Sequence, residues 1–94
     1  MTEDEIRREL ARIAVSEIGK KHVASVSVKP DVDFDGGEAL EILVILKLDA
    51  PSVSGKTYIS ILLKAHDFLN AQQDRRRPSL ALERAHRASV STAK

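Results

Sequence analysis

The sequence contains no cysteine and few aromatic residues, and both shortages exclude classes of function. Without cysteine the chain has no disulfide framework, no catalytic thiolate and no cysteine-based zinc site. This composition suits a reducing compartment, so we expect a cytoplasmic protein. The aromatic residues are Phe34, Tyr58 and Phe68. None lies in the basic C-terminal segment, where stacking on nucleic-acid bases would require one.

A long apolar segment is also missing. The longest apolar run, Ile42 to Leu46, is far shorter than the roughly 20 residues that a membrane-spanning helix needs. The first residues are polar and acidic, whereas a secretory signal begins basic and continues apolar. We therefore expect neither membrane insertion nor secretion.

The net charge of +1 conceals an uneven distribution along the chain. Residues 21–50 hold three lysines against six carboxylates, a net charge of −3. Residues 75–94 hold six basic residues against one glutamate, a net charge of +5. Such a segment is typical of an interaction tail, so we predict contact with a protein partner, with nucleic acid as the alternative. The arginines predicted to make this contact are Arg75, Arg76, Arg77, Arg84 and Arg87.

Two amphipathic helices are predicted. Thr2 and Glu5 form a capping-box pattern, and an apolar stripe follows at helical spacing up to Ile18, before Gly19. A second helix is predicted from about residue 55 to residue 73 after serines that suit an N-cap. Its apolar positions are Tyr58, Ile59, Ile61, Leu62, Leu63, Ala65, Phe68 and Leu69. These positions cover more than one stripe, so we expect wider burial than in the first helix.

Between the helices, two apolar segments predict an antiparallel β-hairpin. Residues 23–29 alternate in polarity before an acidic, glycine-containing turn. Residues 40–48 after the turn are apolar on one face and, on the other, charged at the ends and apolar in the middle. The fold class is therefore α+β, an α-β-β-α domain over residues 1–74 in which two helices pack on the hairpin. We interpret residues 75–94 as a weakly ordered basic arm with a short helix over 80–87, and residues 88–94 as disordered.

The second strand leaves one apolar patch without a partner. Leu43 and Ile45 lie on its outer face between charged ends, opposite the face that the helices cover. Because an isolated hairpin is marginal, we predict a homodimer that pairs two hairpins into a four-stranded sheet or stacks these faces. The alternative is a monomer in which the arm helix folds back over Leu43 and Ile45.

The acidic turn resembles the opening of an EF-hand loop over six residues. Asp31, Asp33 and Asp35 alternate before Gly36, as in D-x-D-x-D-G, and such carboxylates can turn toward one hard cation. The bidentate Glu of that loop is absent, because Ile42 occupies its position. The sequence thus leaves two readings open, a weak calcium-binding module at these aspartates and a solvated turn.

The sequence favours a non-enzymatic protein. Ala50 to Thr57 resembles the end of a phosphate-binding loop, but Pro51 removes a backbone donor, and two strands cannot build the parallel sheet of nucleotide-binding folds. We find no nucleophile in a strand-to-helix elbow beside a paired base, and the three histidines lie far apart. We therefore predict a small binding or assembly protein with no cofactor.

Overall fold

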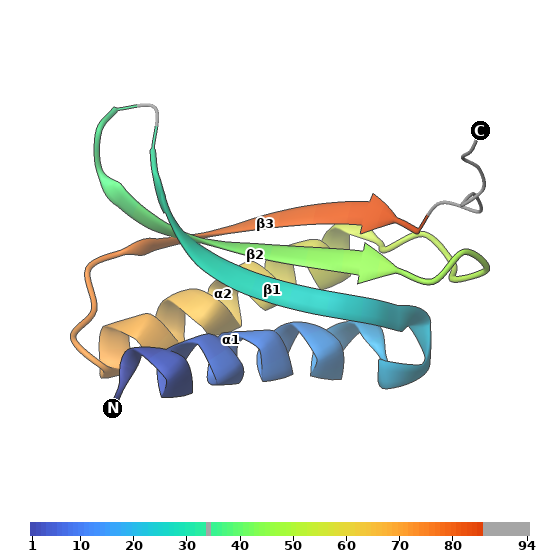
Figure 1. Cartoon of the computed structure of the whole chain (residues 1–94), viewed down its shortest axis with the longest axis horizontal. Helices are drawn as coiled ribbons and strands as arrows, with labels where there is room; N and C mark the ends of the chain where they lie inside the picture. Colours follow the sequence, from blue (N-terminus) through green and yellow to red (C-terminus); the bar gives the residue numbers. More distant parts are fainter. Residues whose placement is uncertain (34, 86–94) are drawn as a thin grey trace, which may run out of the picture.

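The computed structural model describes residues 1–33 and 35–85, which form a small α+β domain (Figure 1). The elements in chain order are α1 (Glu3–Ile18), a short 3-10 helix (Lys20–His22), β1 (Val23–Val32), β2 (Glu38–Leu46), α2 (Gly55–Ala71) and β3 (Arg77–Arg84). The predicted α+β class is confirmed. The predicted α-β-β-α order was incomplete, because it lacks β3.

Helix α1 begins where its capping residues predict. Thr2 N–H donates to Glu5 Oε1 at 2.8 Å, and Glu5 N–H donates to Thr2 Oγ1 at 3.2 Å. These two bonds satisfy first-turn groups that would otherwise lack partners. The helix ends at Ile18 and is capped by Gly19. The backbone φ of Gly19 is 109°, a value that residues with a Cβ rarely adopt. The buried side chains of α1 are Ile6, Leu10, Ile13 and Ala14.

We expect Gly19→Ala to lower the free energy of unfolding by about 1–3 kcal/mol, because the positive φ is strained for any residue with a Cβ. The added Cβ would also lie 3.4 Å from His22 Cδ2. Gly55→Ala is the matched control, since nothing lies within 4 Å of its added Cβ in the first turn of α2. That change is expected to raise stability by about 0.5–1 kcal/mol. Urea denaturation measures both, and equal effects of the same sign would contradict the prediction.

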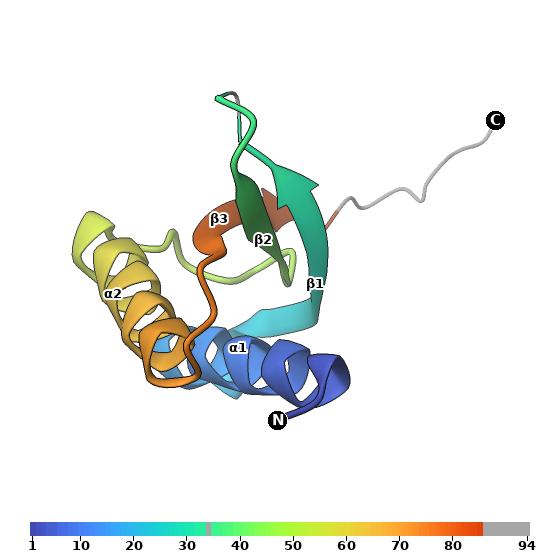
Figure 2. The same cartoon turned by 90° about the vertical axis from the view of Figure 1, so that its left-hand side faces the viewer.

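The sheet has three strands in the order β1-β2-β3, with β1 antiparallel and β3 parallel to β2. Both helices lie against the same face of this sheet, and the hairpin tip rises away from them (Figures 1 and 2). The register of β1 shifts between Val23 and Ser25, so Ala24 is an extra residue in a β-bulge. Beyond the bulge, Val26 pairs with Val44 and both point toward the helices, where they join the core.

The prediction of a basic arm with a helix over 80–87 is wrong for the described part of that segment. Residues 77–84 form β3, which lies beside β2 in parallel, with Leu80 opposite Ile42 and Leu82 opposite Val44. A short apolar run suits a strand as well as a helix, and here burial of Leu80 against the core decides for the strand. Residues 86–94, which include Arg87 and the segment predicted to be disordered, lie outside the described residues.

Helix α2 is buried on fewer sides than its composition predicts. Ser54 is the N-cap, and its Oγ accepts a hydrogen bond from Thr57 N–H at 3.1 Å. The fully buried side chains of α2 are Ile61, Ala65 and Leu69. Ile59 and Leu63, however, are 57% and 59% exposed. The expectation of wider burial than α1 is therefore wrong, because α2 packs mainly against β3 and α1 and its remaining side faces outward.

Candidate functional site

The sheet face that points away from the helices is the candidate site. Strand residues alternate between the two faces, and Val44, Ile42 and Leu80 point toward the core. The outer face therefore carries their neighbours. By register, these outer-face residues are Ser25, Ser27, Lys29, Glu41, Leu43, Ile45, Ser79, Ala81 and Glu83. Among the described residues, no helix or strand covers this face, which we call the open face (Figure 2).

Leu43 and Ile45 form the apolar centre of the open face. In the register of the sheet, Leu43 lies between Ser27 and Ala81, and Ile45 lies between Ser25 and Glu83. Both apolar side chains are half-buried. Their flanking residues are mostly small, so a second flat surface could approach the middle of the sheet closely. Charged residues, among them Lys29 and Glu41, lie at the ends of this patch.

The outer edge of β1 offers only a short length for pairing. Asp33 N–H donates to the Gly37 carbonyl at 2.7 Å, so the odd-numbered residues from Ser25 onward bond to β2. The backbone groups of Val26 and Val28 then point to the outer edge. Pro30, at the next such position, has no N–H to donate. Within residues 1–33 and 35–85, no further strand pairs with this edge.

The outer edge of β3 is protected in a different way. Pro78 lacks an N–H, and the Leu80 carbonyl accepts a hydrogen bond from the Tyr58 hydroxyl at 2.9 Å. This bond holds α2 against β3 and occupies an acceptor that another strand would need. Since β3 also occupies the second edge of β2, two copies could now pair their edges only through β1 or β3. Such pairing would give a six-stranded sheet in place of the four-stranded sheet expected from the sequence.

Arg76 is part of the fold and is not a free cation. Its Nη2 and Nη1 donate to Glu3 Oε1 and Oε2 at 2.9 and 3.0 Å. These bonds connect the residue before β3 to the first residue of α1. The Nε of Arg76 also donates to Asp74 Oδ1 at 3.0 Å. The side chains of Arg76 and Asp74 are only 18% and 13% exposed. We call this group, Glu3, Asp74 and Arg76, the Arg76 cluster.

The Arg76 cluster shifts the pKa of each of its members. The hydrogen bonds from Arg76 hold the pKa of Asp74 below its ordinary value, although burial acts in the opposite direction. Arg76 lowers the pKa of Glu3 in the same way, with a smaller contribution from Arg7. The two carboxylates in turn raise the pKa of Arg76. The cluster is therefore fully charged at neutral pH, and each charge has a partner.

Two other arginines of the predicted arm also have partners. Arg84 Nη1 donates to the carbonyl oxygens of Lys47 and Leu48 at 3.3 and 3.2 Å, and to that of Ala50. Arg84 thus ties the end of β3 to the loop after β2. Arg77 Nε lies 3.6 Å from Asp33 Oδ2. These contacts were not visible in the sequence, because each joins residues more than 30 positions apart.

Arg75 differs from its neighbours in the same segment. Its side chain is exposed, and the ion pairs of the described residues do not include it. The basic surface that the sequence predicts for a partner is thus reduced at Arg76 and Arg84, which the fold already uses, whereas the Arg77 side chain is 68% exposed beside Asp33.

The structure does not bring the three turn aspartates together. Asp31 Oδ1 accepts from the next backbone N–H at 2.8 Å, and Asp35 Oδ1 accepts from the N–H two residues on at 3.1 Å. Asp33 instead lies beside Arg77. Among the described residues, no three His, Cys, Asp or Glu side chains gather as metal ligands do. The arrangement expected of a calcium site is therefore not formed among the described residues, where each of the three carboxylates has a different partner.

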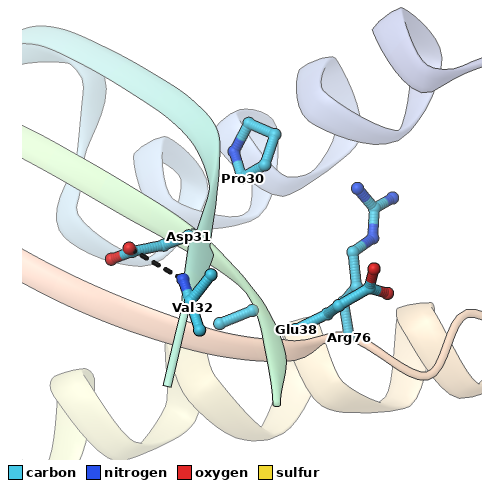
Figure 3. A pocket seen from close by; sticks show the side chains of 6 residues that line it. Pro30, Asp31, Val32, Glu38 and Arg76 are labelled. Carbon is cyan, nitrogen blue, oxygen red and sulfur yellow. Dashed lines mark hydrogen bonds between the residues drawn. The ribbon is translucent and has the colours of Figure 1, made fainter. Parts of the chain in front are cut away.

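Residues of the β1–β2 hairpin and Arg76 border a recess of about 390 Å³ (Figure 3). It is lined by Pro30, Asp31, Val32, Glu38, Ala39 and Arg76. Val32 supplies an apolar wall and is 66% exposed. The lining contains neither a histidine nor a hydroxyl or amine nucleophile, and the guanidinium of Arg76 is already bonded to carboxylates. The other charged groups in the lining are the carboxylates of Asp31 and Glu38, and both residues are exposed.

Comparison with family models, with curated proteins and with solved structures found no match to this chain. We therefore infer its function from its own geometry. In the part of the chain that the structure describes, neither helix is long and apolar enough to cross a bilayer. Apolar residues outside the core lie on the open face and on the outer side of α2, where the sequence predicted burial of Ile59 and Leu63.

Proposed function

We propose that the protein is a non-enzymatic binding or assembly protein that associates with a second copy of itself through the open face. The observation that carries the proposal is the position of Leu43 and Ile45 at the centre of the middle strand, while both helices of the described residues pack on the opposite face. A symmetric dimer would bring the same patch from each copy together. We place this assembly in the cytoplasm, as the lack of cysteine favours.

Stacking of faces is better supported than pairing of edges. Two stacked sheets lie about 10 Å apart, so interdigitation requires apolar centres and small neighbours, as Ser27 and Ala81 supply beside Leu43. The outer edges, by contrast, carry Pro30 and Pro78. Each proline removes one donor that an added strand would need.

The size of the open face predicts a weak dimer. Three strands about 4.8 Å apart and about five residues long present roughly 250 Å². A stable interface buries about 800 Å² on each partner. Because Leu43 and Ile45 are already half-buried, each would gain only part of the ~1.5–3 kcal/mol that full burial of such a side chain contributes. We therefore expect association at about 100 µM and above.

The other candidate functions have less support. Nucleic-acid binding by the arm would need free cations, whereas Arg76 and Arg84 are bonded to carboxylates and carbonyls. Calcium binding at the turn would need converging carboxylates, whereas Asp31 and Asp35 each accept from nearby backbone N–H groups.

Ile45→Asp is expected to weaken self-association more than about tenfold, because a carboxylate in an apolar contact costs about 1–3 kcal/mol. Leu48→Asp is the matched control, since Leu48 is 45% exposed beyond the end of β2 and lies outside the open face. Sedimentation equilibrium at about 100 µM to 1 mM covers the range expected of so small an interface. A wild-type protein that stays monomeric throughout, or an Ile45→Asp variant that associates as wild type does, would refute the proposal.

A further inference from the structure

The outer side of α2 carries a second apolar surface. Ile59 and Leu63 are one helical turn apart, and both are more than half exposed. Helical periodicity places Lys56 at one end of this surface and Asp67 at the other. We call these residues, Lys56, Ile59, Leu63 and Asp67, the outer stripe. His66 and Asn70 are exposed on the same arc of the helix.

The other sides of α2 are already used by the fold. Ile61, Ala65 and Leu69 enter the core, and the Tyr58 hydroxyl bonds to β3. On the side toward α1, Ser60 Oγ donates to Glu17 at 2.8 Å, and Lys64 also bonds to Glu17. The outer stripe therefore points away from both packed neighbours, on the far side of the helix layer from the open face (Figure 2).

We propose that the outer stripe pairs with the same stripe of a second copy, with the two α2 helices antiparallel around a two-fold axis. An axis level with Ile61 sets Ile59 opposite Leu63 of the second copy. At a rise of 1.5 Å per residue along the helix, Lys56 then lies about 7.5 Å from the axis toward the start of α2. Asp67 lies about 9 Å from the axis toward the end of α2. Each lysine meets the other copy's aspartate, and the opposed helix dipoles also favour this direction.

The charge pattern selects this occupant and this direction. A parallel pair would set Lys56 against Lys56 of the second copy and Asp67 against Asp67 of the second copy. Both contacts would then be repulsive. In the antiparallel pair both contacts are attractive, and His66 of one copy also comes near Lys56 of the other. The stripe is thus complementary to itself, as a two-fold interface requires.

This second surface leads to a larger assembly than the proposed dimer. The two patches lie on opposite layers of the molecule, so one copy could hold one neighbour at each. Two different two-fold contacts build tetramers or extended chains instead of closed dimers. A helix of 17 residues is about 26 Å long, so the contact is again small and its affinity low.

Charge reversal tests the pairing separately from the open face. We would measure sedimentation equilibrium up to about 1 mM in the Ile45→Asp background, where association through the open face is weakened more than about tenfold. Lys56→Glu alone and Asp67→Lys alone are each expected to weaken the remaining dimer about tenfold, because each change creates two like-charge contacts. The combined Lys56→Glu and Asp67→Lys variant restores opposite charges and should recover the parent affinity. Leu63→Asp should abolish association.

Cross-linking tests the direction, since the chain has no cysteine of its own. A mixture of Ile59→Cys and Leu63→Cys chains should form mixed disulfides faster than either variant alone, because these positions face each other only in the antiparallel pair. A monomeric Ile45→Asp protein at about 1 mM, or a charge-reversed double variant weaker than both single variants, would overturn the proposal. Neither result would refute the open-face dimer, which is tested separately by the wild-type protein and the Ile45→Asp and Leu48→Asp variants.

Discussion

Leu80→Lys is expected to remove a large part of the protein's stability at room temperature. Leu80 is 7% exposed and lies against the core, so the variant would lose an apolar side chain and bury an ammonium group without a partner. Such a change costs about 4–5 kcal/mol or more. A domain of this size has a total stability of only about 5–14 kcal/mol. Circular dichroism and urea denaturation would show how much of this stability is lost.

Ser79→Lys is the matched control, because it places the same side chain on the neighbouring residue. Ser79 is exposed on the open face and lies opposite Glu41 in the register. A cross-strand pair of opposite charge is neutral or favourable by up to about 1 kcal/mol. If residues 75–94 were a detached arm, both variants would be tolerated equally, and that result would contradict the three-stranded sheet.

Arg76→Met is expected to lower the free energy of unfolding by about 2–4 kcal/mol. The change keeps most of the apolar stem but leaves Asp74, which is 13% exposed, without its charged partner. It also removes the link between Glu3 in the first turn of α1 and the segment before β3. Arg75→Met is the control, since Arg75 is exposed and outside the cluster. A loss equal to that of the control would show that the cluster contributes little.

The contribution of the Arg76 cluster should depend on pH in a defined direction. The folded protein holds the pKa values of Asp74 and Glu3 below their ordinary values. The unfolded chain therefore takes up protons first, and stability falls as the pH drops below about 4 toward the folded pKa values. The stability difference between wild type and Arg76→Met should be full above about pH 5 and shrink toward about pH 2. A difference that stays constant across this range would exclude the charged cluster as its cause.

Features whose determinants are local could be predicted from the sequence. The first turn of α1 follows from Thr2 and Glu5, which lie three residues apart and bond to each other. The outward position of Leu43 and Ile45 follows from alternation along one strand, since their neighbours Ile42 and Val44 are fully buried. In each case, the residues that decide the outcome are adjacent or one turn apart.

Strand β3 could not be predicted in this way, because its partner is distant. Leu80, Ala81 and Leu82 suit a short helix or a strand equally, and only the free edge of β2 decides between them. The partners of the arginines could not be predicted either, because they too are far away in the sequence. A run of basic residues is typical of a free tail, yet Arg76 meets Glu3, which is 73 positions away. The exposure of Ile59 and Leu63 likewise depends on how narrow the completed sheet is.

The parallel pairing of β2 with β3 affects the order in which a growing chain can fold. The hairpin and α1 are complete once β2 has been made, but the partner for the second edge of β2 follows only after α2. Until residue 84 has left the ribosome, the nascent chain presents an unpaired edge next to Ile42 and Val44, the kind of edge that aggregates. We therefore expect the nascent protein to fold late in synthesis and to depend on chaperones before β3 arrives.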